Sequence, residues 1–450
     1  MQVTETLSEG LKRAFKVVVP ATDLDARASE RLNELKGQVK LNGFRPGKVP
    51  VGHLKRVYGK TVMSEVIEQT VNETNGKIVE EHGFKLALQP KVTPPEEDPQ
   101  FQGLLDGGKD LAYTLEIEIL PKIELSNFKD IAIEKPVAEV SDAEVDETLQ
   151  RIADSNRPFA AKDGPAADGD RVTIDFVGSV DGVKFPGGAG EDMPVVIGSK
   201  SFIPGFEEQL VGLSAGEART LEVTFPEAYG EASLAGKPAS FEVTAKAVEA
   251  PGPVTLDDDF AKTLGQESLE ALKTTVRERI GSEHAGATRQ RVKRALLDAL
   301  DATHQFDVPE GLVEQEFLGV WGRVQEDLAA QKRSFEDEGT TEDAARQDYR
   351  RIAERRVRLG LVLAEIGERN NIQVSDDELT RAAVERARQF PGQEQQVWDY
   401  FRRNPQAMAT LRAPLFEEKV VDFLLELASV TEKTVSREEL YKDDEDEKAA

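Results

Sequence analysis

The run Gly43-Phe44-Arg45-Pro46-Gly47-Lys48-Val49-Pro50 lies at the centre of a basic segment in an otherwise acidic chain. Residues 36–60 include seven basic side chains and no Asp or Glu, although the 450-residue chain carries a net charge of -27. The two glycines allow backbone angles that other residues resist, and the two prolines prevent a continuous helix. The run therefore predicts a rigid loop between two helices that presents Phe44, Arg45 and Lys48 as a contact surface. The alternative is an ordinary loop with Phe44 packed into the core.

Charge is distributed unevenly along the chain. Residues 1–115 hold equal numbers of basic and acidic side chains, so the rest of the chain carries the whole net negative charge. An acidic body repels polyphosphate surfaces, whereas the basic segment can approach them. Nucleic-acid contact is therefore expected to be local and sensitive to salt. The basic residues of the segment are Lys36, Lys40, Arg45, Lys48, Lys55, Arg56 and Lys60.

Length and composition predict several domains and a cytoplasmic protein. A chain of 450 residues is too long for one core and suggests about three domains. Charged residues make up 31% and aromatic residues 6%, which is typical of long amphipathic helices. The absence of cysteine excludes disulfides and thiolate chemistry. No signal peptide and no membrane-length apolar run is expected, so no membrane partner is predicted.

The first 120 residues predict a small α+β domain. We expect a strand over 11–19, a helix that begins near Thr22 or Asp23, a second helix from Pro50 and a third over 61–81. Further strands are predicted at 86–88 and 113–119. The basic loop then joins two helices.

The rest of the chain changes from β-rich to helical. Ser141 and Glu144 predict a capping box, 157–249 a compact antiparallel domain with a hairpin at Asp181-Gly182, and the residues after Pro251 long helices. Most apolar side chains of these helices are expected to pack in cores. We expect helix breaks at Pro309, Pro391-Gly392, Pro405 and Pro414 and a disordered acidic tail at the end.

The middle of the chain resembles the FK506-binding-protein type of peptidyl-prolyl isomerase. The resemblance covers about 170–248 in ordered blocks: Val172-Thr-Ile-Asp-Phe176-Val-Gly178, Asp181-Gly-Val-Lys-Phe185, Val195-Val-Ile-Gly198, Phe202-Ile203-Pro-Gly205-Phe206-Glu207, Gly212-Leu-Ser-Ala-Gly216-Glu217, Ala228-Tyr229-Gly230 and Ala239-Ser-Phe241-Glu-Val243. It implies prolyl isomerisation, a reaction that an apolar pocket with a few fixed hydrogen bonds can catalyse without a nucleophile.

This resemblance also implies the residues of the site. Ile203 would donate its backbone N–H to the substrate carbonyl, Tyr229 would donate its hydroxyl, and Phe206 would form the floor. Pro186 departs from the acidic residue that many members carry there. The residues implied to line the pocket are Phe176, Phe185, Met193, Phe202, Ile203, Phe206, Tyr229 and Phe241. A β-domain core without activity is the alternative for these aromatic side chains.

The run at 43–50 resembles the ribosome-docking signature of the bacterial trigger factor family, Gly-Phe-Arg-x-Gly-x-x-Pro, and matches every fixed position. With the isomerase blocks and the helical C-terminal part, the resemblance extends along nearly the whole chain. It implies a multidomain α+β fold: an α+β ribosome-docking domain (1–115), a connector (116–150), an inserted FKBP-like antiparallel β domain (151–249), an all-α chaperone domain with helical arms (250–435) and an acidic tail (436–450). The docking residues would be Gly43, Phe44, Arg45, Pro46, Gly47, Lys48 and Pro50.

The implied function is an ATP-independent chaperone on the large ribosomal subunit, at the tunnel exit, that binds nascent and unfolded polypeptides and isomerises X-Pro bonds. Two alternatives stay open: a free isomerase with a helical dimerisation or partner-binding module, and a chaperone with an inactive pocket. A homodimer away from the ribosome also stays open. No cofactor and no metal is expected, because His53, His82, His284 and His304 show no ligand spacing and are predicted at surfaces or helix ends.

Overall fold

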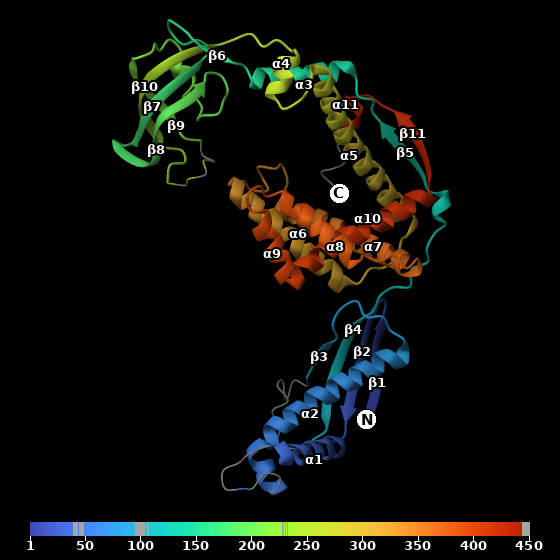
Figure 1. Ribbon diagram of the computed structural model, residues 1–450. Coiled ribbons are helices and arrows are strands. Elements are labelled where there is room, and N and C mark those ends of the chain that lie inside the picture. Colours follow the sequence, from blue (N-terminus) through green and yellow to red (C-terminus); the bar gives the residue numbers. More distant parts are fainter. Residues whose placement is uncertain are drawn as a thin grey trace.

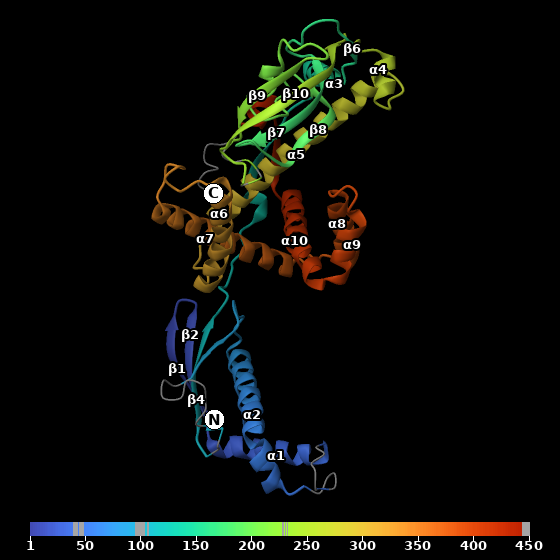
Figure 2. The same ribbon diagram turned by 90° about the vertical axis from the view of Figure 1, so that its left-hand side faces the viewer.

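The computed structural model describes residues 1–38, 44, 49–94, 104–105, 108–226, 229, 231 and 233–442. Figures 1 and 2 show an elongated molecule with an N-terminal α+β domain at one end, a helical body in the middle and a β-rich domain at the other end. The β-rich domain is inserted in sequence between the N-terminal domain and the helical body. This architecture confirms the predicted fold class.

The N-terminal domain is an antiparallel sheet in the order β1-β2-β4-β3, with two helices against it. Side chains of β4 alternate between buried and more exposed positions, so that Leu111, Tyr113 and Leu115 enter the core that the helices cover. The elements are β1 (Gln2–Glu9), β2 (Lys12–Val19), α1 (Ala21–Gln38), α2 (Val51–His82), β3 (Lys91–Thr93) and β4 (Leu111–Glu118).

Helix α2 corrects one prediction. The sequence predicts two helices after Pro50, but the structure has one helix of 32 residues that ends at Gly83 with a φ of 64°. Gly59, near the expected break, costs only about 1 kcal/mol relative to alanine inside a helix. No proline lies between Pro50 and Pro90, so nothing stops the helix earlier. Helix α1 also begins at Ala21, slightly before the predicted start.

The strands of this domain differ from the prediction at two places. The strand predicted at 86–88 is wrong, because Leu86 forms only an isolated bridge with Ile119. Strand β1 is not predicted, because nearly all its side chains are exposed and it lacks an alternating apolar pattern. It forms by backbone pairing along β2.

The N-terminal domain contacts the helical body through a carboxylate. Oε1 of Glu118 accepts the backbone N–H of Glu310 at 2.7 Å, and Oε2 accepts that of Gly311 at 2.9 Å. These N–H groups belong to the first turn of helix α6 (Glu310–Gln331), where Pro309 provides no side-chain cap. A side chain almost 200 residues away along the chain, in another domain, therefore caps this helix.

The connector between these domains contains a strand and a helix. Strand β5 (Ala132–Val137) pairs in parallel with β11 (Ser429–Thr434), and ion pairs such as Lys135 with Glu432 at 2.8 Å link side chains 297 residues apart. Helix α3 (Asp142–Ser155) begins with the predicted capping box of Ser141 and Glu144. The connector is thus held by the end of the chain.

The β-rich domain is an antiparallel sheet in the order β6-β10-β7-β8, and β9 also pairs with β10. The predicted hairpin joins β7 to β8 through Asp181 and Gly182, whose φ values of 52° and 78° fit a tight two-residue turn. The strands are β6 (Phe159–Ala161), β7 (Arg171–Val180), β8 (Val183–Val196), β9 (Ala218–Thr224) and β10 (Pro238–Pro251).

The C-terminal part is helical, as predicted, with one break in the wrong place. Pro414 lies inside α10, because the residues on both sides are fixed by packing: Ala407 before it and Val420 and Leu424 after it are buried. Tertiary packing thus outweighs the single hydrogen bond that proline removes. The helices are α4 (Asp258–Thr263), α5 (Leu269–Thr303), α6 (Glu310–Gln331), α7 (Glu342–Arg369), α8 (Asp376–Arg388), α9 (Glu394–Arg403), α10 (Pro405–Leu427) and α11 (Arg437–Leu440).

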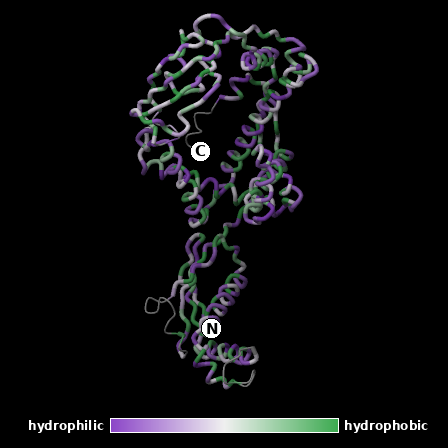
Figure 3. Tube along the Cα trace, turned by 60° about the vertical axis from the view of Figure 1, so that its left-hand side comes forward, coloured by the Kyte–Doolittle hydropathy of each residue, from purple (hydrophilic) through white to green (hydrophobic). Residues whose placement is uncertain are grey.

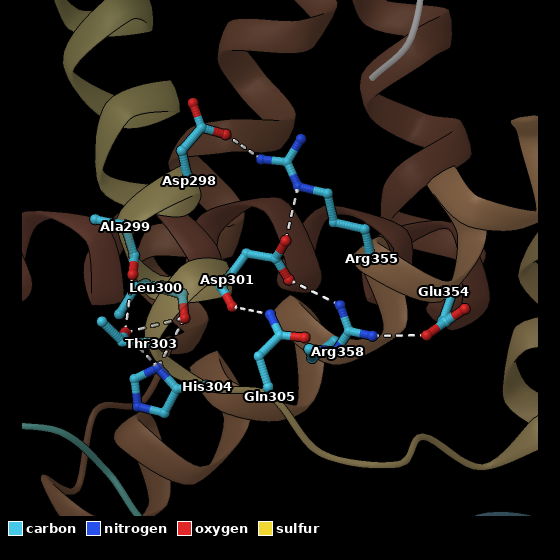
Figure 4. A network of polar contacts seen from close by, with 10 residues as sticks. All are labelled: Asp298, Ala299, Leu300, Asp301, Thr303, His304, Gln305, Glu354, Arg355 and Arg358. Atoms are coloured by element: carbon cyan, nitrogen blue, oxygen red, sulfur yellow. Dashed lines mark hydrogen bonds and ion pairs between the residues drawn. The ribbon is translucent and has the colours of Figure 1, made fainter.

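Ion pairs join α5 to α7 in the helical body (Figure 4). The guanidinium of Arg358 lies 3.0 Å from Asp301, and that of Arg355 lies 3.6 Å from the same carboxylate and also pairs with Asp298. An apolar core shared by these two helices, α10 and the connector lies beside the network. Burial of apolar side chains already favours the packing of α5 against α7, and the ion pairs help to fix the orientation of the two helices.

Two histidines are buried rather than solvent-exposed. His284 lies in the middle of α5, with Nδ1 3.2 Å from the Ala138 carbonyl oxygen and Nε2 3.4 Å from Glu144, so its predicted surface or helix-end position is wrong. His304 follows the last residue of α5, as a helix-end residue should, and its Nε2 accepts the backbone N–H of Ser126 at 3.1 Å. Both therefore fasten the connector to α5.

The end of the chain is more ordered than predicted. Residues from 436 onward are predicted as a tail, but α11 begins at Arg437 and its Leu440 is buried. The acidic run at 443–447 lies outside the described residues.

Within the described ranges, no helix has the length and apolarity needed to cross a bilayer. In Figure 3 hydrophilic and hydrophobic residues are mixed along the helices of all three parts. The same ranges contain no group of three or more His, Asp or Glu side chains arranged to hold a metal ion.

Candidate functional site

A cluster of aromatic rings lies in the β-rich domain. The ring of Phe206 stacks on Phe202 with centroids 5.0 Å apart and meets Phe241 edge-on at 5.4 Å. Phe176 contacts all three rings at 6.0 to 6.5 Å, and Phe185 lies 6.1 Å from Phe241. The structure therefore brings together the rings that the isomerase resemblance implies.

Exposure grades the members of this cluster from floor to rim. Phe206 and Phe241 are 1% and 5% exposed and form the floor, whereas Met193 and Tyr229 are 40% and 39% exposed at the rim. The half-buried side chains between these levels are Phe176, Phe185, Phe202 and Ile203. An apolar floor with open edges fits a side chain that enters from solvent.

Two glycines let the rings lie flat against the strands. A Cβ at Gly178 would fall 2.5 Å from Cε1 of Phe241 and 3.0 Å from Phe185. One at Gly190 would fall 2.7 Å from Phe176 and 3.0 Å from Met193. The position of these rings thus depends on glycine in the neighbouring strand.

Sequence reasoning missed one member of the cluster, Phe225. Its ring lies 5.8 Å from Phe185, 6.4 Å from Phe241 and 4.6 Å from Tyr229. It therefore connects the rim tyrosine to the floor. The alternating pattern of 220–225 carried the signal, because it places Phe225 on the same face as the buried Leu221 and Val223.

Two polar groups sit beside the rings. The Ile203 carbonyl accepts the N–H of Phe206 at 3.1 Å, while the N–H of Ile203 makes no hydrogen bond to any residue that the structure describes. Tyr229 donates its backbone N–H to the Pro226 carbonyl at 3.1 Å, and its side chain, which ends in the hydroxyl, is half-exposed. An apolar floor with an N–H that has no partner among the described residues, and with a hydroxyl at its edge, can desolvate an amide and hold its carbonyl, as prolyl isomerisation requires.

Of the predicted docking loop, the structure describes only Phe44, Val49 and Pro50. Phe44 is 37% exposed, and its ring lies 5.1 Å from that of His53, so it is not packed into the core. Pro50 precedes α2, and its carbonyl accepts the N–H groups of His53 and Leu54. The remaining predicted docking residues, Gly43, Arg45, Pro46, Gly47 and Lys48, lie outside the described residues, as does Lys40.

The surroundings of Phe44 are basic. The first turn of α2 contains no acidic residue, and Lys55, Arg56 and Lys60 are exposed on the same helix. The positive end of a helix with exposed cations attracts phosphate. Both views show the junction of α1 and α2 at the end of the N-terminal domain that is remote from the helical body (Figures 1 and 2).

Family models match three consecutive stretches of the chain. A model described as bacterial trigger factor protein matches residues 1–152, and one described as the C-terminus of that protein matches residues 268–426. Between them, the FKBP-type peptidyl-prolyl cis-trans isomerase model matches residues 162–246. The last match covers every residue of the ring cluster.

Curated relatives match along the full chain. A trigger factor of Xanthobacter autotrophicus is 79% identical over 100% of both chains, and one of Azorhizobium caulinodans is 72% identical over 100% of both. Among solved structures, one titled for substrate recognition by the trigger factor chaperone covers 95% of this chain and 99% of its own, with a TM-score of 0.58 and 19% identity. That structural match supports the fold.

Proposed function

The chain belongs to the bacterial trigger factor family, chaperones with an FKBP-type prolyl isomerase domain, and on that basis we propose that it binds nascent chains beside the ribosomal tunnel exit and isomerises their X-Pro bonds. The protein would bind the ribosome in the cytoplasm through the loop at 43–50. The observation that carries this proposal is an exposed Phe44 in a basic setting, with its ring 5.1 Å from that of His53 in the first turn of α2.

The proposed dock combines an apolar anchor with cations. Phe44 would enter a protein surface, whereas Arg45 and Lys48 would contact carboxylate or rRNA phosphate. Lys55 and Arg56 on α2 extend the basic surface. Because phosphate contacts release counterions, binding should weaken steeply as salt increases.

The proposed division of labour follows the separate cores. The docking unit is residues 1–115, the isomerase unit 151–249 and the client-binding helical unit 250–435, joined by the connector 116–150. Separate clusters of buried apolar side chains lie in the three units, although the N-terminal cluster includes Ile117 and the helical unit also shares a cluster with the connector. Weak contacts on several parts of one scaffold would give avidity while each contact can still release. Away from the ribosome, we keep a homodimer as part of the proposal.

The isomerase site is proposed to be the ring cluster. Phe206 and Phe241 would receive the proline ring, the Ile203 N–H would bind the preceding carbonyl, and Tyr229 would add its hydroxyl. Turnover of a proline peptide should fall in Tyr229→Phe, which removes only the hydroxyl. An unchanged rate would remove Tyr229 from the site.

Co-sedimentation with 70S ribosomes tests the docking proposal. The unchanged protein should pellet at low salt and dissociate at high salt, and the triple variant Phe44→Ala, Arg45→Ala, Lys48→Ala should stay in the supernatant. A matched control, Leu318→Ala, Arg323→Ala, Arg333→Ala, removes an exposed apolar side chain and two cations from the helical body and should still pellet. If the unchanged protein fails to pellet at low salt, a free isomerase becomes the better account.

A further inference from the structure

Glu207 is a buried carboxylate directly after the floor residue of the isomerase site. Glu207 is only 4% exposed, and its carboxylate faces the loop between Gly198 and Phe202. Its oxygens accept five hydrogen bonds: from the backbone N–H groups of Gly198 at 2.9 Å, Lys200 at 2.9 Å, Ser201 at 2.8 Å and Phe202 at 3.1 Å, and from the hydroxyl of Ser199 at 3.1 Å. One side chain thus binds an entire loop.

No basic side chain pairs with Glu207 among the described residues. Burial alone would raise its pKa, but the N–H groups of Lys200 and Phe202, with the other donors, hold the pKa below its ordinary value. The carboxylate is therefore charged at neutral pH, and its hydrogen bonds are of the stronger, charge-assisted kind.

The loop that Glu207 binds is conformationally unusual. Lys200 has a φ of 58° and Gly198 a φ of 90°, and a lysine in this left-handed region is strained. Without the carboxylate, four inward-facing N–H groups would need other acceptors. The hydrogen bonds therefore keep the loop in a shape that its residues alone do not prefer.

This arrangement decides which N–H group remains available. The N–H groups of Lys200, Ser201 and Phe202 all point to Glu207, and the next one, on Ile203, is left without a partner in the described part of the chain. Phe202 is fixed at the same time, with its ring stacked on Phe206. The loop thus ends beside an apolar floor with a donor that no described residue occupies.

We propose that Glu207 is a positioning residue for prolyl isomerisation: by binding the N–H groups of 198–202, it directs the Ile203 N–H and the Phe202 ring into the site. The inference rests on the proposed role of the ring cluster as the isomerase site. Glu207 itself does not touch the substrate. Because Glu207 acts through the loop, its replacement should lower kcat for prolyl isomerisation more than it weakens substrate binding.

The test compares Glu207→Gln with Glu208→Gln in the full chain. Glu208 is the adjacent, exposed glutamate, so both variants make the same change of charge. Glutamine keeps one acceptor oxygen but replaces the other with an NH2 group, which cannot accept hydrogen bonds from the loop N–H groups. The loop therefore loses about half of its hydrogen bonds to this side chain. We expect kcat for a proline peptide to fall about tenfold to a hundredfold in Glu207→Gln, since small misplacements have effects of that size. KM should stay nearly constant, and Glu208→Gln should match the unchanged protein.

Amide hydrogen exchange supplies a second readout. The amides of Gly198, Lys200, Ser201 and Phe202 should exchange faster in Glu207→Gln and stay protected in Glu208→Gln. Equal kcat in the two variants, with loop protection unchanged, would overturn the inference while leaving the isomerase site intact. No turnover in the unchanged protein would overturn both.

A milder variant covers the case in which Glu207→Gln does not fold. Ser199→Ala removes a single donor to the carboxylate from an exposed position. One hydrogen bond contributes roughly 1 kcal/mol, so we expect kcat to fall about fivefold with the fold intact. An unchanged kcat in folded Ser199→Ala, with loop amides equally protected, would contradict the positioning role.

Discussion

The cap that Glu118 provides for α6 predicts a measurable loss of stability when it is removed. In Glu118→Gln the side chain keeps one acceptor oxygen, so at most one of the hydrogen bonds to Glu310 and Gly311 survives, and the negative charge at the helix N-terminus is lost. A cap contributes about 1 kcal/mol, and a charge at this position about 0.3–1 kcal/mol. We therefore expect the free energy of unfolding of the part that contains α6 to fall by about 1–2 kcal/mol.

Tryptophan fluorescence can follow this helix. The chain has two tryptophans, Trp321 on α6 and Trp398 on α9, so a Trp398→Phe background leaves a single probe on the helix that Glu118 caps. With a urea dependence of about 2 kcal/mol per M, the transition should move to lower urea by about 0.5–1 M.

Glu116→Gln is the matched control for this prediction. Glu116 lies on the same strand, and its carboxylate pairs with Lys91 at 3.1 Å on an exposed surface, where such pairs contribute little. In Glu116→Gln, the urea midpoint of the Trp321 fluorescence transition should stay unchanged. If Glu118→Gln leaves the transition unchanged, or if the control moves it equally, the capping argument is wrong.

Three further predictions concern the other parts of the molecule. Gly178→Ala should displace the Phe241 ring, destabilise the β-rich domain by about 1–3 kcal/mol in calorimetry and lower isomerase turnover, without affecting ribosome co-sedimentation. Leu149→Ala, at a fully buried position, should cost about 2–5 kcal/mol in the same experiment. Hydrogen bonds from Lys419 and Ser375 lower the pKa of Glu378 to about 2 from 4.5, so its contribution to stability is complete above pH 4.5 and is lost as the pH falls toward 2. In an acid titration followed by circular dichroism, Lys419→Met should show a smaller loss, because only the hydrogen bonds from Ser375 remain.

Local signals predicted the elements that depend on local chemistry. The capping box at Ser141 and the turn at Asp181-Gly182 act over a few residues, and both are confirmed. The breaks predicted in α2 and at Pro414 are wrong, because packing on both sides sustains each helix through its weak point. The pairing of β5 with β11 was not predicted, because the two strands lie nearly 300 residues apart, beyond any local pattern.

The candidate site was accessible to sequence reasoning for the same reason. Its rings come from ordered blocks with fixed spacing, and the structure places them in one cluster. Phe225 lacked a motif of its own and was missed. Glu207 stood within a quoted block, but its role depends on the directions of four backbone N–H groups, which only the folded loop fixes.

Because β5 pairs with β11, the parts of this protein can finish folding only in a certain order during synthesis. The N-terminal sheet has all its strands once residue 118 is made, and the β-rich domain once residue 251 is made. Ile131 and Ile133 of the connector, by contrast, share a buried apolar cluster with Val420 and Leu424, and β5 gains its partner strand only once residues 429–434 are made. While a ribosome is still making α10, these isoleucines lack the part of their cover that α10 provides. The helical body is therefore the last part to close, and each newly made copy passes through a stage in which it exposes the kind of apolar surface that chaperones bind.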